Sequence, residues 1–306
     1  MILSWQQIPS ATISEIMCKG FDGVVLDTEH GSFNPETINN CIQVIKLAGK
    51  KAFVRLTEVS PTDIRSCLDS GCDGLIFSTV ETVEQCEAIK NCCYFPPKGK
   101  RGLGLSRENM WGEKSQLVSS GPIIVPQIES KLGIENIEKI KSYGFDFHLI
   151  GPYDLSLSLE IPGDFKHEKF QQAIKTMRDS IPNDKMAIHI PKDLDAWNLW
   201  QSEMEEWLNY SDYGMLCIGM DTIAIFQYNK VNLSKNDTSA SFETIIYEDL
   251  DKRKSDRFEY IIPKINFSKE LENKTNLKGD FTFKSQALAK NYDTNIFETI
   301  NINDLV

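Results

Sequence analysis

The sequence lacks the features of several large classes of protein. No apolar run approaches the roughly 20 residues that a membrane-spanning helix needs, and the first residues, MILSWQQIPS, contain no basic region followed by an apolar signal segment. Positive charge is not in excess either, since the formal net charge is −11 and the sequence pI is about 5.0. We therefore expect a cytoplasmic protein that acts on small molecules, with neither a nucleic acid nor a membrane as partner.

The residue types that are rare in most proteins are unevenly distributed along this chain. Its eight cysteines form no paired CxxC pattern of the zinc-ribbon type, so we expect reduced thiols that pack as small hydrophobic side chains. Residues 230–306 contain no Cys, Trp or Met and a single Gly, and the polar segment 231–241 has the composition of a linker. The sequence therefore predicts one domain over residues 1–229, followed by a linker and a β-rich extension of unknown role over residues 230–306.

Apolar runs, polar loops and amphipathic segments alternate through the first 229 residues. Segments such as PETINNCIQVIKLAG, SPTDIRSCLDSG and GIENIEKIKSYG (133–144) have helical periodicity and end in glycine. Eight short strands that are separated by such helices, and not by hairpins, predict a (β/α)8 TIM barrel of the α/β class. The predicted strands cover residues 3–5, 23–26, 52–55, 74–77, 123–127, 147–150, 186–189 and 215–218.

Four polar residues stand where predicted strands give way to loops, which is where TIM barrels build their active sites. Glu129 in PQIES and Asp154 in GPYDLS are 25 residues apart, as are His30 in LDTEHG and Arg55 in FVRLTE. Two carboxylates are hard oxygen ligands for a divalent cation and leave positions for water and a 2-oxo acid. Such a cation would stabilise the enolate left by C–C cleavage. Arg55 would add a permanent positive charge, and His30 would carry the proton.

Each of these residues also has a structural explanation. Glu129 and Asp154 stand where carboxylates commonly cap helices, Arg55 fits an ion pair at a strand end, and His30 fits a hydrogen-bonded loop histidine. Taken singly, those explanations are the more common ones. The motifs in which the residues occur favour the catalytic interpretation.

Several motifs together resemble a known family. The strings LDTEHG, VRLTE, KGKRGLGLSR, PQIES and GPYDLSLSLEIPGDF, followed by AIHI and IGMDT, are similar in order and spacing to the HpcH/HpaI class II aldolase family of the phosphoenolpyruvate/pyruvate barrel superfamily. The resemblance covers residues 3–226. It implies a carbon–carbon lyase of carbohydrate or aromatic catabolism that reversibly cleaves 4-hydroxy-2-oxo acids into pyruvate and an aldehyde, through an enolate stabilised by Mg²⁺, Mn²⁺ or Co²⁺.

The resemblance also implies roles for individual residues. Glu129 and Asp154 match the metal ligands, Arg55 the residue that stabilises the enolate, and His30 the acid/base residue. Asp27 and Asp69 match two acidic neighbours that orient the histidine. The pyruvate-binding elements of the family are matched by Gln127 and by the backbone of Gly151, Pro152, Tyr153 and Asp154.

The chain departs from the family pattern at several places. Residues 56–58 and Ser78 stand where the family often has proline, and Glu160 stands where we expect glycine. The resemblance implies a homo-oligomer in which subunits exchange a last helix, but the segment after IGMDT is short and polar. The open alternatives are a decarboxylase, an acyl-CoA lyase or a C–C-forming synthase of the same superfamily, or a catalytically compromised fusion product.

The last 50 residues have a different character. Residues 257–306 show strand-like alternation between polar turns, and part of this segment resembles barrel strands of the outer-membrane lipopolysaccharide-assembly protein family. Either this segment is a joined fragment of foreign origin without a catalytic role, or it is a small β appendage.

Overall fold

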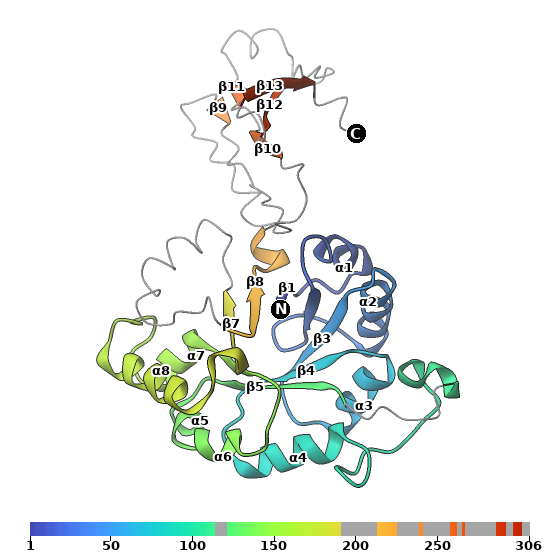
Figure 1. Cartoon of the computed structure of the whole chain (residues 1–306), viewed down its shortest axis with the longest axis vertical. Helices are drawn as coiled ribbons and strands as arrows, with labels where there is room; N and C mark the ends of the chain where they lie inside the picture. The colour runs from blue at the N-terminus through green and yellow to red at the C-terminus, as the bar shows by residue number, and fades with distance from the viewer. Residues whose placement is uncertain are drawn as a thin grey trace. The chain divides into compact units, whose positions relative to one another are not determined.

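Eight parallel strands close into a barrel within the first part of the chain. The computed structural model describes residues 1–113, 121–190 and 213–224, and strands within 239–301. The chain divides into two compact units, Met1–Ala224 and Ile225–Val306. Neighbouring strands follow the order of the sequence, and β8 pairs with β1 (Figure 1). The strands are β1 (Ile2–Gln6), β2 (Gly23–Asp27), β3 (Lys51–Leu56), β4 (Gly74–Phe77), β5 (Ile123–Ile128), β6 (His148–Ile150), β7 (Met186–Ile190) and β8 (Met215–Ile218).

Helices follow the strands and surround the barrel (Figure 1). The predicted TIM barrel is therefore confirmed, with strand ends that differ from the predicted ones by no more than one residue. The helices are α1 (Ala11–Met17), α2 (Pro35–Leu47), α3 (Pro61–Asp69), α4 (Val83–Cys93), α5 (Lys131–Glu135), α6 (Ile137–Lys141), α7 (Pro152–Ser158) and α8 (Glu168–Ser180), with short 3-10 turns η1 (Arg107–Gly112) and η2 (Asn183–Lys185).

Local capping explains where several helices begin. The side chains of Asn34, Ser60 and Thr82 accept hydrogen bonds from backbone N–H groups in the first turns of α2, α3 and α4. One predicted helix, over residues 133–144, is instead divided into α5 and α6. The division falls at Asn136, whose backbone leaves the helical conformation and whose side chain donates to the carbonyl oxygen of Glu81 at 2.9 Å.

Alternation along the strands separates two apolar cores. Val25 and Phe53 point into the barrel, whereas Val24, Leu26 and Val54 pack under the helices. All eight cysteines are free, and all but the half-buried Cys92 are buried, as predicted. The barrel interior is thus filled by side chains, which leaves the carboxyl ends of the strands, called the rim below, as the place for chemistry.

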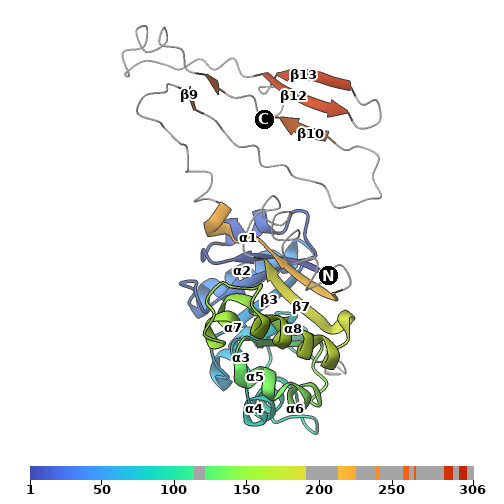
Figure 2. The same ribbon diagram turned by 90° about the vertical axis from the view of Figure 1, so that its left-hand side faces the viewer.

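The second unit contains short antiparallel strands in the parts that the structure describes. Strands β10 (Phe258–Ile261), β12 (Gln286–Asn291) and β13 (Ile296–Asn301) form one sheet, and β9 (Ser239–Ala240) pairs with β11 (Ile265–Asn266). Figure 2 shows the three-stranded sheet from the side. These strands agree with the β-rich character predicted for the extension.

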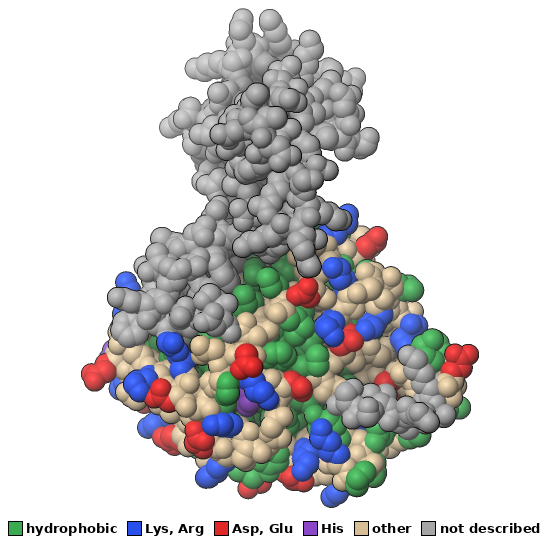
Figure 3. Space-filling view, in the orientation of Figure 1, with side chains coloured by type: hydrophobic (Ala, Val, Ile, Leu, Met, Phe, Trp, Pro, Cys, Tyr) green, Lys and Arg blue, Asp and Glu red, His purple; other side chains and the backbone are tan. Residues whose placement is uncertain are grey.

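The surface of the first unit mixes charges of both signs. On the face seen in Figure 3, basic and acidic side chains are interspersed among polar and apolar ones. Within the described residues, no helix combines the length and the apolar character required to span a bilayer.

Candidate active site

A buried arginine at the end of β3 anchors the rim. Arg55 is 6% exposed and donates from Nε and Nη2 to the two carboxylate oxygens of Asp27, at 2.8 and 2.7 Å. Its Nη1 lies 2.7 Å from a carboxylate oxygen of Glu29, and its Cζ lies 4.8 Å from the ring centroid of Trp5. We call Arg55, Asp27, Glu29 and Trp5 the rim cluster.

Hydrogen-bond donors surround the buried carboxylate of Asp27. Its carboxylate also accepts hydrogen bonds from Trp5 Nε1 at 3.2 Å and from Gln7 Nε2 at 3.0 Å. Burial by itself would raise the pKa of Asp27, but the hydrogen bonds and charge of Arg55 outweigh burial and lower this pKa to about 2. Arg55 is therefore fixed with a permanent charge.

A neutral histidine lies beneath the rim cluster. His189, at the end of β7, stacks on Trp5 with ring centroids 3.9 Å apart, and its Nε2 lies 3.3 Å from the carbonyl oxygen of Gly219. Because a carbonyl only accepts, Nε2 carries the hydrogen. Burial lowers the pKa of His189 to about 3, and the nearby charge of Arg55 acts in the same direction. His189 therefore packs against the rim cluster through its stacking on Trp5.

Glu129, directly after β5, is a second buried carboxylate at the rim. It is 4% exposed, and its Oε1 accepts hydrogen bonds from the backbone N of Thr79 at 2.7 Å and from Thr79 Oγ1 at 2.8 Å. Gln127 Nε2 donates a short hydrogen bond to Oε2. Burial raises the pKa of Glu129; the bonds from Gln127 and Thr79 oppose that rise, and the neighbouring charge of Asp154 adds to it.

The backbone of Gly151 passes closely over Glu129. A Cβ atom at residue 151 would lie 2.7 Å from the Cβ of Glu129 and 3.2 Å from Gln127 Nε2, so only glycine fits. Gly151 caps α7, with Pro152 in the first turn and Asp154 exposed one residue after Tyr153. The predicted site residues Gln127 and Glu129, at the end of β5, therefore lie next to Gly151, which follows β6.

His30 lies on the exposed loop after β2. Its backbone N donates to Asp27 Oδ1 at 3.4 Å, but the side-chain oxygens of Asp27 are occupied by Arg55, Trp5 and Gln7. The expectation that Asp27 orients the imidazole of His30 is therefore not met in this structure. A charged bidentate guanidinium is the stronger partner for a buried carboxylate.

Asp69 does not lie beside His30 in the same chain. It is the last residue of α3, which returns the chain to the amino ends of the strands, where the backbone N of Asp73 bonds to the carbonyl of Ala52 at the start of β3. The rim lies at the other end of β3, about 20 Å away for a strand of this length. Asp69 therefore lies away from His30 of the same chain, and its predicted role in orienting that histidine stays a prediction.

Asp69 instead belongs to a second arginine cluster, called the outer cluster. Arg101 is 5% exposed, contacts Asp69 at 2.8 Å and donates to Glu108 at 2.9 Å, and its Cζ lies 4.8 Å from the ring centroid of Phe95. These contacts attach the loop after α4 to the end of α3.

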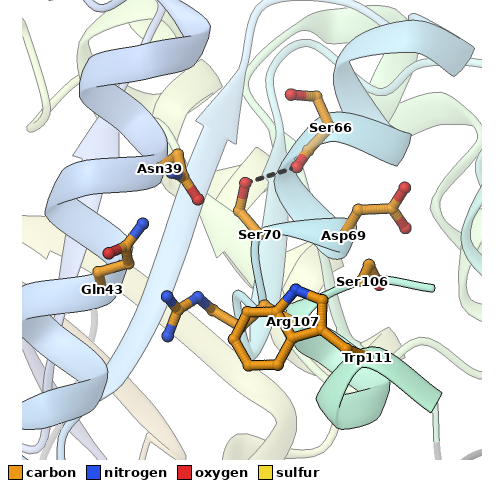
Figure 4. Close-up of a pocket in the computed structure, with 8 residues that line it drawn as sticks. All are labelled: Asn39, Gln43, Ser66, Asp69, Ser70, Ser106, Arg107 and Trp111. Carbon is orange, nitrogen blue, oxygen red and sulfur yellow. Dashed lines mark hydrogen bonds between the residues drawn. The ribbon is translucent and has the colours of Figure 1, made fainter. Parts of the chain in front are cut away.

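A groove of about 470 Å³ lies beside the outer cluster, between α2, α3 and η1. Figure 4 shows Asp69 and Ser70 on one side and Arg107 with Trp111 across the opening. Trp111 is 60% exposed and has a positive φ of 54°. The groove is lined by none of the rim residues.

Sequence reasoning missed three contributors to the rim: Trp5, Glu29 and Thr79. Glu29 stands in the same LDTEHG motif as His30, and Thr79 follows the end of β4 as Arg55 stands near the end of β3. For Glu29 and Thr79 the available signal was their place shortly after an apolar strand, whereas Trp5 lies inside β1. The residue types of Thr79 and Trp5 did not indicate a functional site, because threonine and tryptophan are common packing residues.

The residues at the rim fit a divalent cation. Glu129 and Asp154 provide hard oxygen ligands, the charge of Asp154 contributes to the raised pKa of Glu129, and Gln127 Oε1 is buried without a hydrogen-bond partner. Among the described residues no group of three His, Cys, Asp or Glu side chains gathers around one point. The arrangement therefore offers two carboxylates as candidate ligands for a cation.

The rim of this (β/α)8 barrel carries two carboxylates, a fixed arginine and an exposed histidine. TIM-barrel enzymes build their active sites from residues in this position. The model of the HpcH/HpaI aldolase/citrate lyase family matches residues 6–190. A 2-keto-3-deoxy-L-rhamnonate aldolase of Escherichia coli (strain K12) is 30% identical over 179 residues, which cover 56% of this chain and 67% of that protein. A 4-hydroxy-2-oxovalerate aldolase of Rhodococcus jostii (strain RHA1) is also 30% identical, over 56% of this chain and 68% of that protein.

Solved structures give the same fold. A family protein from Burkholderia cenocepacia J2315 has a TM-score of 0.66 at 21% identity, covering 75% of this chain and 91% of that one. Citrate synthase SbnG has a TM-score of 0.62 at 25% identity, covering 76% and 91%. The chain belongs to the HpcH/HpaI aldolase/citrate lyase family. It is a lyase of the class II aldolase group, which acts on small molecules and uses a divalent metal ion.

Proposed function

We propose that the protein reversibly cleaves a 4-hydroxy-2-oxo acid into pyruvate and an aldehyde, with the metal held by Glu129 and Asp154. The observation that carries this proposal is the position of Glu129, a buried carboxylate bonded through both oxygens and placed beside Asp154 at the rim. A bound Mg²⁺, Mn²⁺ or Co²⁺ ion would supply Lewis-acid stabilisation of negative charge on the substrate.

Arg55 supplies fixed positive charge to the developing oxyanion. Three of its five N–H donors bind Asp27 and Glu29, which leaves two for a substrate oxygen. Because the guanidinium cannot rotate away from Asp27, little reorganisation is needed as charge develops. Removing this positive charge would slow cleavage more than it weakens substrate binding.

His30 carries the proton of the substrate's 4-hydroxyl group. Its imidazole stands on an exposed loop next to the rim cluster, and histidine is the side chain that most often serves in general acid/base catalysis. Gln127 and the close backbone of Gly151, Pro152, Tyr153 and Asp154 provide polar contacts for the carboxylate end of pyruvate.

The test is pyruvate release from a 4-hydroxy-2-oxo acid such as 4-hydroxy-2-oxovalerate. We expect chelation to abolish release and Mg²⁺, Mn²⁺ or Co²⁺ to restore it, with the preferred ion found by comparing the three. Glu129→Gln should remove the restored activity. Turnover that survives chelation would overturn the proposal.

A C–C-forming synthase is the second candidate. It is favoured by the 25% identity with citrate synthase SbnG, whose structure matches this chain over 91% of its length. A product analysis separates the two: an aldolase releases free pyruvate from 4-hydroxy-2-oxovalerate, whereas a synthase condenses a 2-oxo acid with an enolate donor and releases none.

The role of residues 230–306 is a separate proposal. We infer that this segment forms a unit distinct from the barrel and has no catalytic role, since the chain divides into two compact units near residue 225. Deleting 230–306 should leave pyruvate release intact. A loss of both activity and solubility would instead assign the segment a role in folding or assembly of the barrel, and the origin of the segment stays a prediction.

A further inference from the structure

The loop after β4 is tied to strands on both of its sides. The backbone N of Ser78 donates to the carbonyl of Leu56 in β3 at 3.0 Å, and the backbone N of Val80 donates to the carbonyl of Gln127 in β5 at 3.0 Å. Thr79, between them, must turn its backbone sharply. It adopts a φ of +49°, in the left-handed region that a β-branched side chain rarely enters.

Every polar group of Thr79 has a partner. Its backbone N and Oγ1 both donate to Glu129 Oε1, at 2.7 and 2.8 Å, and its carbonyl accepts from Gln85 Nε2 at 3.0 Å. Strain of this kind persists where neighbouring contacts hold it. The two bonds to Glu129 are contacts of that sort.

These bonds also set which direction of the Glu129 carboxylate stays free. A carboxylate has about four lone-pair directions, and Thr79 with Gln127 uses three of them. The fourth is left for a cation. Removing the Oγ1 bond would free the carboxylate to rotate and would give a cation a less ordered ligand.

We propose that Thr79 is a positioning residue that orients Glu129 for divalent-metal binding through its side-chain hydroxyl. This inference rests on the proposed function, in that Glu129 is taken as the metal ligand. The backbone N–H of any residue other than proline could make one of the two bonds, so the hydroxyl is the specific contribution of threonine at this position.

The experiment is calorimetric titration of the metal-free full-length protein with Mn²⁺, which needs no substrate and no turnover. Thr79→Val keeps the shape and the backbone N–H but lacks the hydroxyl, and should raise the Mn²⁺ Kd about tenfold, the lower end for lost partners of metal ligands. Thr79→Ser, which keeps the hydroxyl, should bind Mn²⁺ within about threefold of the wild type, by the same reasoning.

Two further variants separate the hydroxyl from backbone strain and from general damage. Thr79→Gly relieves the positive φ, so it should melt no lower than the wild type and still lose Mn²⁺ affinity as Thr79→Val does. Thr28 is the matched control, because its hydroxyl donates to the carbonyl of Arg55 at 2.6 Å and does not contact Glu129. Thr28→Val should leave the Mn²⁺ Kd unchanged.

The outcomes distinguish the inference from the function on which it rests. If Glu129→Gln weakens Mn²⁺ binding but Thr79→Val or Thr79→Gly binds like the wild type, the role of Thr79 is overturned and the metal site stands. If Glu129→Gln itself binds Mn²⁺ like the wild type, the proposed site and the role of Thr79 both fail. Circular dichroism of each variant confirms that it is folded.

Discussion

The rim cluster and the outer cluster are built alike but lie at opposite ends of the barrel strands. In each, an almost fully buried arginine sits between two carboxylates, and its Cζ lies 4.8 Å from the centroid of an aromatic ring. The rim cluster grows from residues at the ends of β1, β2 and β3, whereas the outer cluster attaches a loop to the end of α3. The same ion-pair geometry therefore serves a candidate site in one place and loop attachment in the other.

The difference teaches that location, and not ion-pair geometry, separates the two arginines. Arg55 connects through Glu29 and the hydroxyl of Ser78 to the loop that holds Glu129. Arg101 has no such connection among the described residues. An arginine held by carboxylates is informative about chemistry only when it stands where strands end and ligands can enter.

Replacing each arginine in turn should give the largest difference between the two clusters. Arg55→Lys keeps a positive charge but loses the bidentate contact with Asp27, so kcat/KM for pyruvate release should fall about 10²- to 10³-fold. Steady-state kinetics with saturating metal measures the effect.

The matched variant in the outer cluster should affect folding instead. Arg101→Lys keeps the charge but loses the planar fork of donors that contacts Asp69 and Glu108, both only partly buried, and should destabilise the protein by about 2 kcal/mol, while the folded enzyme keeps kcat/KM within tenfold. A fall in kcat/KM as large as that of Arg55→Lys would end the distinction between the clusters. Denaturant unfolding of both variants gives the stability half of the comparison.

Of the two clusters, the rim cluster is the one that packs against a histidine, His189. This contact predicts that the stability of the protein depends on pH. The pKa of His189 is lowered to about 3 in the fold, below its ordinary value near 6.5, so the unfolded chain takes up the proton first as the pH falls. Stability is thus present above pH 6.5 and is lost below it, by about 3 kcal/mol between pH 7 and pH 4.

His189→Phe keeps the stacking on Trp5 and does not titrate. The unfolding free energy of this variant should vary less between pH 7 and pH 4 than that of the wild type. The buried His148, whose pKa is lowered to about 4 mainly by burial, acts equally in both proteins and cancels from the comparison. Parallel pH profiles for the two proteins would contradict the prediction.

Asp27 titrates in a lower window with the same sign. Its pKa is lowered to about 2 in the fold, where the attraction of Arg55 outweighs burial, so it stabilises the fold above pH 4 and loses that contribution as the pH falls toward 2. The contribution is about 2 kcal/mol. Asp27→Asn should therefore narrow the stability gap to the wild type as the pH falls from 5 to 3, as denaturant unfolding would measure. A constant gap would argue against ionised Asp27 as the source.

The aromatic rings should give the smallest effects. Phe95→Leu removes the ring beside Arg101 and should cost about 1 kcal/mol of stability without changing kinetics. Trp5→Phe keeps a ring but removes the N–H donor to Asp27, and should cost about 1 kcal/mol and several-fold in kcat. Equal effects of the two variants on kcat would contradict the conclusion that only the rim cluster affects catalysis.

Much of the barrel was readable from local sequence. The strand at Gly74–Phe77 was predicted residue for residue, because short apolar runs bounded by turns are a local property. The expectation of glycine at Glu160 also reflects a real constraint, since Glu160 has a positive φ of 64°. The split between α5 and α6 was not predicted, because it depends on Asn136 reaching Glu81, far away in the sequence.

The sequence by itself determined the strand and helix order, the reduced and mostly buried cysteines, and the set of polar residues that follow the strands. Each of these depends on periodicity, turn chemistry or side-chain type, which act over a few residues. Only the tertiary structure decided that Asp27 binds Arg55 and not the imidazole of His30, that Asp69 lies at the far end of the barrel, and that Thr79 holds Glu129. Those pairings join residues up to 50 positions apart, and the parallel pairing of neighbouring strands brings Asp27 to Arg55 and Thr79 to Glu129.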